Sequence, residues 1–226
     1  MTTLVFYDLE TTDLDIFTAK IVEFAFICDD KILHEYVNPT VPIHNSEIHG
    51  ITDEKVKNKS SFKEIIFKIN KFIPSKAILI AHNGNNYDQL VLEQEYKRAN
   101  MKMPKNWVFF DTIPICHKML PYQRSYKLGY LHELIFHKKI DKEHTALEDT
   151  KALMKLYYYL KPTDSEFKLY TKKQTIYTKS KDILLKYKGD DIINDYNNNK
   201  LDLTKYSKWY QDKIILSIKH YIYMTT

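Results

Sequence analysis

Close to the N-terminus the chain reads Thr3-Leu4-Val5-Phe6-Tyr7-Asp8-Leu9-Glu10. The apolar, β-branched and aromatic residues 3–9 predict a buried strand. Asp8 and Glu10 stand two positions apart, and in a strand such residues point to the same side. Two carboxylates at the end of an apolar strand repel each other, so a divalent cation is a natural partner, and oxygen ligands select Mg²⁺ or Mn²⁺. The alternative is a strand that simply leaves the core into a polar turn.

Outward from this strand the sequence alternates between strand and helix patterns. Four further runs predict strands, at residues 20–28, 31–37, 77–81 and 107–110. The second and third strands flank Asp29-Asp30 and predict an antiparallel hairpin. Amphipathic stretches predict helices at about 61–73, 87–99, 112–119, 127–136 and 145–160. This order predicts an α/β domain with a mixed five-stranded sheet and helices on both faces.

Two predicted helices begin with the pattern of a capping box, in which a Ser or Thr and a Glu three residues later bond each other's backbone. The first is Ser61 with Glu64, and the second is Thr145 with Glu148. If the second box forms, Glu148 accounts for one acid at the start of that helix. Asp149 beside it is then left for another role.

Composition excludes several classes of protein. The chain has 226 residues, of which 44% are hydrophobic and 28% charged. Two cysteines are too few for a disulfide scaffold or a Cys-rich zinc finger. No apolar run reaches the ~18–20 residues that span a bilayer, and Asp8 and Glu10 interrupt the place where a signal peptide would be apolar. We therefore expect a cytoplasmic protein with no membrane partner.

Pro162 is the expected boundary between a domain of residues 1–161 and an extension of residues 162–226. The extension holds twelve Lys, no Arg and eight Asp plus Glu, a balance of +4 within a total net charge of +5. It is rich in Tyr and is predicted to be mostly helical, near residues 179–188 and 204–223. Lysines between aromatic rings suit a surface that binds single-stranded nucleic acid. Alternatively, the rings form the core of a small helical unit.

Two further carboxylates stand at or near the start of predicted helices. Asp88 comes after the fourth strand, in Asn83-Gly84-Asn85-Asn86-Tyr87-Asp88. His144 stands just before the last core helix, and Asp149 lies in its first turns, so both can face one cleft. Taken singly, Asp88 is an ordinary helix-start aspartate, His144 a surface histidine, and Asp149 a solvated helix residue.

Taken in order, these motifs resemble the DEDDh family of 3′-to-5′ exonucleases, which includes polymerase proofreading subunits and three-prime repair exonucleases. Three sequence words carry the resemblance: Phe6-Tyr7-Asp8-Leu9-Glu10-Thr11-Thr12, Ile48-His49-Gly50-Ile51-Thr52 and Ala81-His82-Asn83-Gly84. The resemblance covers roughly residues 3–160 and implies a ribonuclease H-like sheet. One departure is Asp13, where the family usually has Gly, which concerns the turn beside the site but removes no ligand.

The resemblance implies a role for each matched residue. Asp8, Glu10, Asp88 and Asp149 would hold two Mg²⁺ or Mn²⁺ ions, and His144 would act as general base. The residues expected to bind substrate would be Leu9, Thr11, Thr12, Leu14, Ile48, His49, Asn83 and Tyr87. Among these, Leu9 and Thr11 would hold the terminal 3′-hydroxyl, while Leu14, Ile48 and His49 would wedge against the terminal bases. His49 before Gly50 could equally make a structural turn.

The expected activity is metal-dependent hydrolysis of single-stranded DNA or RNA from the 3′ end, releasing nucleoside 5′-monophosphates. DNA and RNA both stay open as substrates. The alternative is a nucleic-acid-binding or partner-docking module without catalysis. Loss of an acidic ligand would favour that alternative, and all four acids and the histidine are present.

Overall fold

The computed structural model describes residues 3–16, 18–172 and 194–204, together with Gln211, Ile214, Ile215 and Ile218. The chain divides into two compact units, Met1–Lys173 and Gln174–Thr226. Elements named below belong to the first unit. The helix predicted near residues 179–188 lies outside the described residues, as does most of the one predicted near 204–223.

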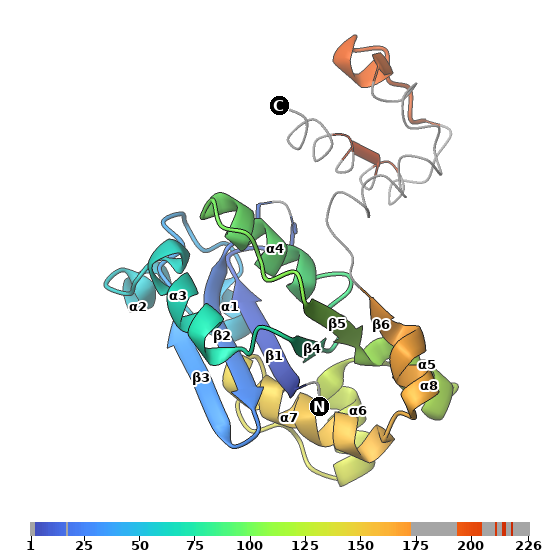
Figure 1. Cartoon of the computed structure of the whole chain (residues 1–226). Coiled ribbons are helices and arrows are strands. Elements are labelled where there is room, and N and C mark those ends of the chain that lie inside the picture. The colour runs from blue at the N-terminus through green and yellow to red at the C-terminus, as the bar shows by residue number, and fades with distance from the viewer. Residues whose placement is uncertain are drawn as a thin grey trace. The chain divides into compact units, whose positions relative to one another are not determined.

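A mixed sheet forms the centre of the first unit, with strands in the order β3-β2-β1-β4-β5-β6 (Figure 1). The strands are β1 (Thr3–Thr11), β2 (Ile21–Cys28), β3 (Lys31–Tyr36), β4 (Ala77–Ala81), β5 (Trp107–Asp111) and β6 (Thr171–Lys172). Strand β1 pairs antiparallel with β2 and parallel with β4. The five predicted strands and the β2–β3 hairpin are therefore confirmed, and the two-residue β6 was not predicted.

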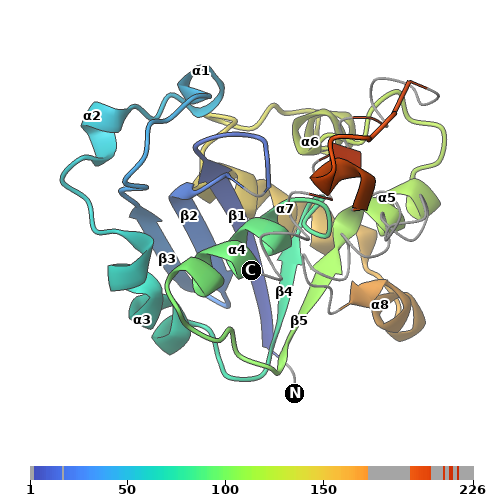
Figure 2. The same cartoon turned by 90° about the horizontal axis from the view of Figure 1, so that it is seen from above.

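Helices cover both faces of the sheet (Figure 2). They are α1 (Ser46–His49), α2 (Asp53–Val56), α3 (Phe62–Phe72), α4 (Asp88–Arg98), α5 (Thr112–Met119), α6 (Leu128–Phe136), α7 (Ala146–Leu160) and α8 (Asp164–Tyr170). The five predicted helices correspond to α3 to α7. The one-turn helices α1 and α2 were not predicted, because four residues carry no periodic pattern.

Alternation along β1 assigns its side chains to two separate cores. Val5, Tyr7 and Leu9 pack with residues of α3 and α4, whereas Phe6 packs with residues of α5, α6 and α7. Because residues two apart share a face, Asp8 and Glu10 lie on the same face of the sheet as Phe6. The strand therefore presents its two carboxylates toward the side that α7 covers.

One predicted capping box forms and the other does not. The Ser61 backbone N–H donates to Glu64 Oε2 at 2.7 Å, as predicted. At α7 the prediction was wrong: the Thr145 hydroxyl donates to the Lys142 carbonyl, and Glu148 pairs with Lys151. The first amide of α7 is instead bonded by a carboxylate from β2, described below.

The first compact unit runs past Pro162 to Lys173. Helix α8 follows Pro162 and begins at a capping box between Thr163 and Glu166. Phe167 stacks on Phe110 of β5 with ring centroids 4.9 Å apart, and β6 pairs antiparallel with β5. The residues just after Pro162 thus extend the sheet and the core beneath it. In the described part of the chain, no helix is long and apolar enough to cross a bilayer.

Candidate active site

Strand β1 and helix α7 bring three carboxylates together. Oxygens of Asp8, Glu10 and Asp149 all lie within 4.8 Å of one another. Asp149 Oδ2 accepts a hydrogen bond of 3.0 Å from the backbone N–H of His144. Its other oxygen, Oδ1, is buried and has no hydrogen-bond partner among the described residues. A buried acceptor without a donor is costly unless a ligand satisfies it.

Asp88, the first residue of α4, is buried at the edge of this cluster. Asp88 lies outside the set of three. Burial is the largest cause that raises the pKa of Asp8, and the charge of Asp88 is the second largest. Hydrogen bonds from the backbone of Leu9 and from its own backbone favour its charged form. The structure thus brings Asp88 close enough to Asp8 for the two charges to interact.

Burial and nearby negative charges raise the pKa values of all four acids: Asp8 and Glu10 are repelled by other members of the set, Asp88 by Asp111, and Asp149 by Glu143, Glu23 and Glu148. Burial is the largest cause each time; it raises the pKa of Glu10 to about 8 and the pKa values of Asp88 and Asp149 to about 7. The pKa of Asp8 is raised well above its ordinary value. A bound cation would favour the charged carboxylates and offset their repulsion. Clustered hard oxygen donors and the unpartnered Asp149 Oδ1 therefore fit a divalent metal ion.

These shifts predict that the metal-free protein loses stability as pH rises. Folded pKa values of about 7 to 8 mean that the folded state holds more protons than the unfolded state from about pH 4 to pH 8. In chelator, the melting temperature of wild type relative to Asp8→Asn should therefore fall across this window. Excess Mn²⁺ should remove the fall. Parallel melting curves for the two proteins at every pH would contradict this.

His144 lies in the exposed loop that leads into α7. Its backbone is left-handed, with φ of 67°, and its N–H is the donor to Asp149. The chain turns there, so His144 stands directly before the helix that carries Asp149. His144 is exposed, and its backbone contacts a carboxylate of the cluster.

The backbone at the end of β1 is fixed by the residues expected on the substrate side. Thr12 Oγ1 accepts from the backbone N–H of Lys20 at 3.0 Å. The hydroxyls of Thr11 and Tyr87 lie 2.5 Å apart and 2.8 and 2.5 Å from the carbonyl oxygen of Asp13, so their two protons are shared within one cluster of three oxygens. Leu9, Thr11 and Thr12 are buried. The side chains of Thr11 and Thr12 hold the turn after β1 and that of Leu9 lies in the core, so a substrate would meet the backbone there.

Asp13 closes the next turn with its own carboxylate. Its two oxygens accept from the backbone N–H of Asp15 at 2.5 Å and from Thr18 Oγ1 at 2.9 Å. Asp13 does not have a positive φ. Aspartate thus replaces the family's usual Gly without backbone strain, and its side chain stabilises the loop.

The three residues expected to wedge against bases fall into two groups. Leu14 and Ile48 are 69% and 38% exposed, unusual for large apolar side chains. His49 is buried, and its ring joins two backbones: Nε2 donates to the Thr11 carbonyl at 3.0 Å, and Nδ1 accepts from the Ile51 N–H at 3.1 Å. Burial also lowers the pKa of His49. The ring of His49 therefore makes the structural turn, whereas Leu14 and Ile48 are free to contact a ligand.

The loop between β4 and α4 is organised from β5. Asp111 accepts hydrogen bonds from the backbone N–H groups of Asn83 at 2.9 Å and Asn85 at 3.1 Å. Asn83 is exposed and left-handed, with φ of 67°. A Cβ at Gly84 would lie 2.6 Å from the Ala81 Cβ, so only glycine fits there. This tight loop fixes the start of α4 and therefore Asp88.

Sequence reasoning missed two buried acids beside the site, Asp111 and Glu23. Asp111 caps α5 through the Ile113 N–H, and an Asp between a strand and a helix is a readable cap signal. Glu23 is the one charged residue in β2, an otherwise apolar and fully buried strand. Charged residues are rarely buried without partners, so this position was also a readable signal.

The family model described as "Exonuclease" matches residues 5–157, which include all four acids and His144. The chain belongs to the exonuclease family. The resemblance seen in the sequence is thereby confirmed. Among relatives, exonuclease DPD1 of Arabidopsis thaliana, named as chloroplastic/mitochondrial, is 30% identical across 70% of this exonuclease and 56% of its own length. DNA polymerase III subunit epsilon of Rickettsia prowazekii is 32% identical, across 75% of this chain and 79% of its own.

Solved structures agree on the fold. Exonuclease I superposes with a TM-score of 0.64 at 17% identity, over 74% of this chain and 42% of its own. Exonuclease I of Escherichia coli with a dT13 oligonucleotide gives 0.62 at 17% identity, over 71% and 41%. This exonuclease spans about half the length of the Arabidopsis relative and 12% of the PolC-type DNA polymerase III of Pediococcus pentosaceus, which is 27% identical over 72% of this chain. The predicted ribonuclease H-like fold is confirmed.

Proposed function

We propose that this exonuclease hydrolyses single-stranded nucleic acid from the 3′ end and releases nucleoside 5′-monophosphates. The observation that carries the proposal is the cluster of Asp8, Glu10 and Asp149, in which the buried Asp149 Oδ1 lacks a partner among the described residues. A phosphodiester is an anion, so a cluster of carboxylates can accept it only with cations between them.

Asp8, Glu10, Asp88 and Asp149 would hold two Mg²⁺ or Mn²⁺ ions. When bound, such a pair stabilises the attacking and the leaving oxygen of an in-line displacement at phosphorus. His144 would take the proton of the attacking water, since it is exposed and stands just before the helix that carries Asp149. The hydrogen bond from its backbone to Asp149 keeps base and ligand together.

A terminal nucleotide would be held by backbone at the end of β1, around Leu9 and Thr11. Leu14 and Ile48 would pack against its base, since both side chains are exposed and apolar. Asn83, in the loop before α4, would contact the nucleic-acid strand, while Tyr87 supports the Thr11–Asp13 turn. Solved exonuclease I structures with dT13 and dA16 oligonucleotides support a single-stranded substrate.

The direct test compares 3′-labelled with 5′-labelled oligomers, DNA beside RNA, in Mg²⁺, Mn²⁺ and chelator. A 3′ label should be released at once as a mononucleotide, whereas a 5′ label should pass through a ladder of shortening oligomers. Activity unaffected by chelator would refute the metal site. Release of the 3′ label in fragments several nucleotides long would indicate an endonuclease instead.

We further propose that the basic, Tyr-rich C-terminal segment holds substrate outside the active site. Deleting residues 174–226 should weaken affinity for long oligomers more than for dinucleotides, because only long strands reach beyond the site. The salt dependence of binding should also flatten, since fewer phosphates are neutralised. Oligomers of increasing length, titrated by fluorescence anisotropy at several salt concentrations, measure both effects.

The truncation is placed after Lys173 so that α8 and β6 remain on the sheet. If the segment merely covers apolar surface, the shortened protein should aggregate, and it should lose activity equally on all lengths. A soluble truncation with unchanged affinity and salt slope for long oligomers would refute the proposal.

A further inference from the structure

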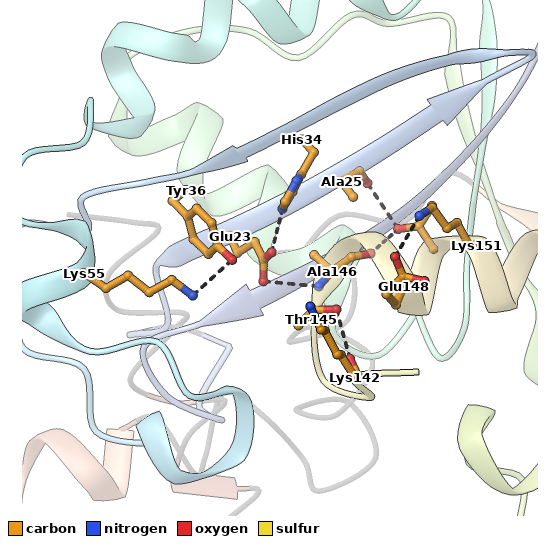
Figure 3. Close-up of polar contacts among 11 residues, drawn as sticks. Glu23, Ala25, His34, Tyr36, Lys55, Lys142, Thr145, Ala146, Glu148 and Lys151 are labelled. Atoms are coloured by element: carbon orange, nitrogen blue, oxygen red, sulfur yellow. Dashed lines mark hydrogen bonds and ion pairs between the residues drawn. The ribbon is translucent and has the colours of Figure 1, made fainter. Parts of the chain in front are cut away.

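Glu23 is a buried acid whose two carboxylate oxygens are both occupied (Figure 3). It lies on β2 directly opposite Glu10 of β1. Oε1 lies 2.6 Å from His34 Nε2 on β3. Oε2 accepts a hydrogen bond of 3.2 Å from the backbone N–H of Ala146, the first residue of α7. One side chain thus joins β2 and β3 to the start of the helix that carries Asp149.

The bond to Ala146 meets a need of the helix. The first amides of a helix have no intrahelical partner, and an anion near the N-terminus is favourable for them. Thr145, at the N-cap position, supplies no side-chain acceptor. The acceptor for the Ala146 amide therefore comes from β2, more than a hundred residues earlier in the chain.

The attachment point is close to both residues that α7 contributes to the site. Ala146 lies two residues after His144 and three before Asp149, and the His144 N–H in turn donates to Asp149. One helical turn on, the Thr150 hydroxyl donates to the Ala146 carbonyl at 2.6 Å and lies 3.5 Å from the carbonyl oxygen of Ala25, so it also faces β2. The start of α7 is thus held to the strand next to β1, which carries Asp8 and Glu10.

We propose that Glu23 is a positioning residue, which holds His144 and Asp149 in register with the carboxylates of β1. This inference rests on the proposed hydrolytic function. We assign Glu23 no metal ion, because it lies outside the set of carboxylates within 4.8 Å of one another and each of its oxygens has a partner, whereas Asp149 Oδ1 has none within the described structure. His34 holds the carboxylate from the other side and so aims it at α7.

Two variants of Glu23 separate its hydrogen bonds from its charge. Glu23→Ala removes both, while Glu23→Gln removes the charge and keeps an acceptor for Ala146. We expect Glu23→Ala to lower kcat about 10- to 100-fold with KM for an oligonucleotide little changed, as for other residues that orient a metal ligand. Glu23→Gln should keep most of kcat. Glu148→Gln, which removes a charge near Asp149 but no such bond, is the matched control and should behave as wild type.

A second pair of variants tests the same bond from the helix side. Ala146→Pro deletes the donor N–H at the first helical position, where proline is tolerated, and Thr145 before it is already extended. If the hydrogen bond between Ala146 and Glu23 positions α7, Ala146→Pro should lower kcat. The double variant Glu23→Ala with Ala146→Pro should then have a kcat no lower than that of the worse single variant. Equal losses for Glu23→Gln and Glu23→Ala, or multiplying losses in the double variant, would overturn the proposal.

Amide hydrogen exchange separates failure of this inference from failure of the proposed function. In the full-length protein, Glu23→Ala should speed exchange at Ala146 and at His144 at least tenfold, and Glu23→Gln should leave both protected. That result would stand even if wild type hydrolysed nothing. Unchanged protection in Glu23→Ala would refute the attachment whatever the activity shows.

Discussion

Asp8→Ala and Asp149→Ala are each expected to abolish hydrolysis while leaving the protein folded. Each removes one carboxylate from the set that lies within 4.8 Å. The loss should exceed the ~10- to 100-fold effect of removing a residue that only orients a ligand. Turnover of a labelled oligonucleotide in saturating Mg²⁺ or Mn²⁺ measures it. Wild-type turnover in either variant would refute the site.

Without metal, both variants should be at least as stable as wild type. Because burial and like charges raise the pKa values of these acids, removing one relieves repulsion in the metal-free protein. At pH 7.5 in chelator, both variants should melt at or above the wild-type temperature. Adding Mn²⁺ should raise the melting temperature of wild type more than that of either variant. Glu148→Gln is the control: it lies next to Asp149 but pairs with Lys151, and it should keep full activity.

His144→Ala is expected to lower turnover by roughly 10²- to 10⁴-fold, the usual contribution of a general base. His144 is exposed, and its hydrogen bond to Asp149 comes from the backbone, which the substitution keeps. The variant should therefore bind Mn²⁺ and a 3′ end as wild type does. Single-turnover rates and Mn²⁺ titration, measured on the same preparations, separate the lost chemical step from lost binding.

The rate of wild type should rise with pH through the range in which a histidine loses its proton, and the rise should be absent in His144→Ala. The cluster's carboxylates also titrate when no metal is bound, so the profile is measured at saturating Mn²⁺. A flat wild-type profile from pH 5 to 8, with chemistry shown to limit the rate, would contradict the role of His144. A profile unchanged in His144→Ala would do the same.

Much of this fold and site could be predicted from patterns among residues close in sequence. Alternation along β1 predicted that Asp8 and Glu10 share a face, and the structure has them there because the strand period is two. The capping box at Ser61 also formed as its local sequence indicates. In both cases residues close in sequence determine the geometry.

Contacts between distant residues account for what the sequence did not predict. Thr145 and Glu148 have the spacing of a capping box, yet the Ala146 amide bonds Glu23 from β2. For His49 the sequence left a base contact and a structural turn open, and in the structure the backbones of Thr11 and Ile51 bond its ring. The sheet likewise extends past Pro162 because β6 finds a partner in β5. No pattern within a short window encodes such choices.

The distance in sequence between Asp8 and Asp149 has a consequence for synthesis on the ribosome. The first carboxylates emerge with β1, and the last emerges only with α7, after β2, β3, β4 and β5 have been made. A nascent chain therefore cannot assemble the cluster until most of the first compact unit has emerged. Since metal binding favours the state that holds every ligand, the ions would stabilise the complete fold and add little stability to partly folded chains. Nucleolytic competence would thus be delayed until folding is nearly complete.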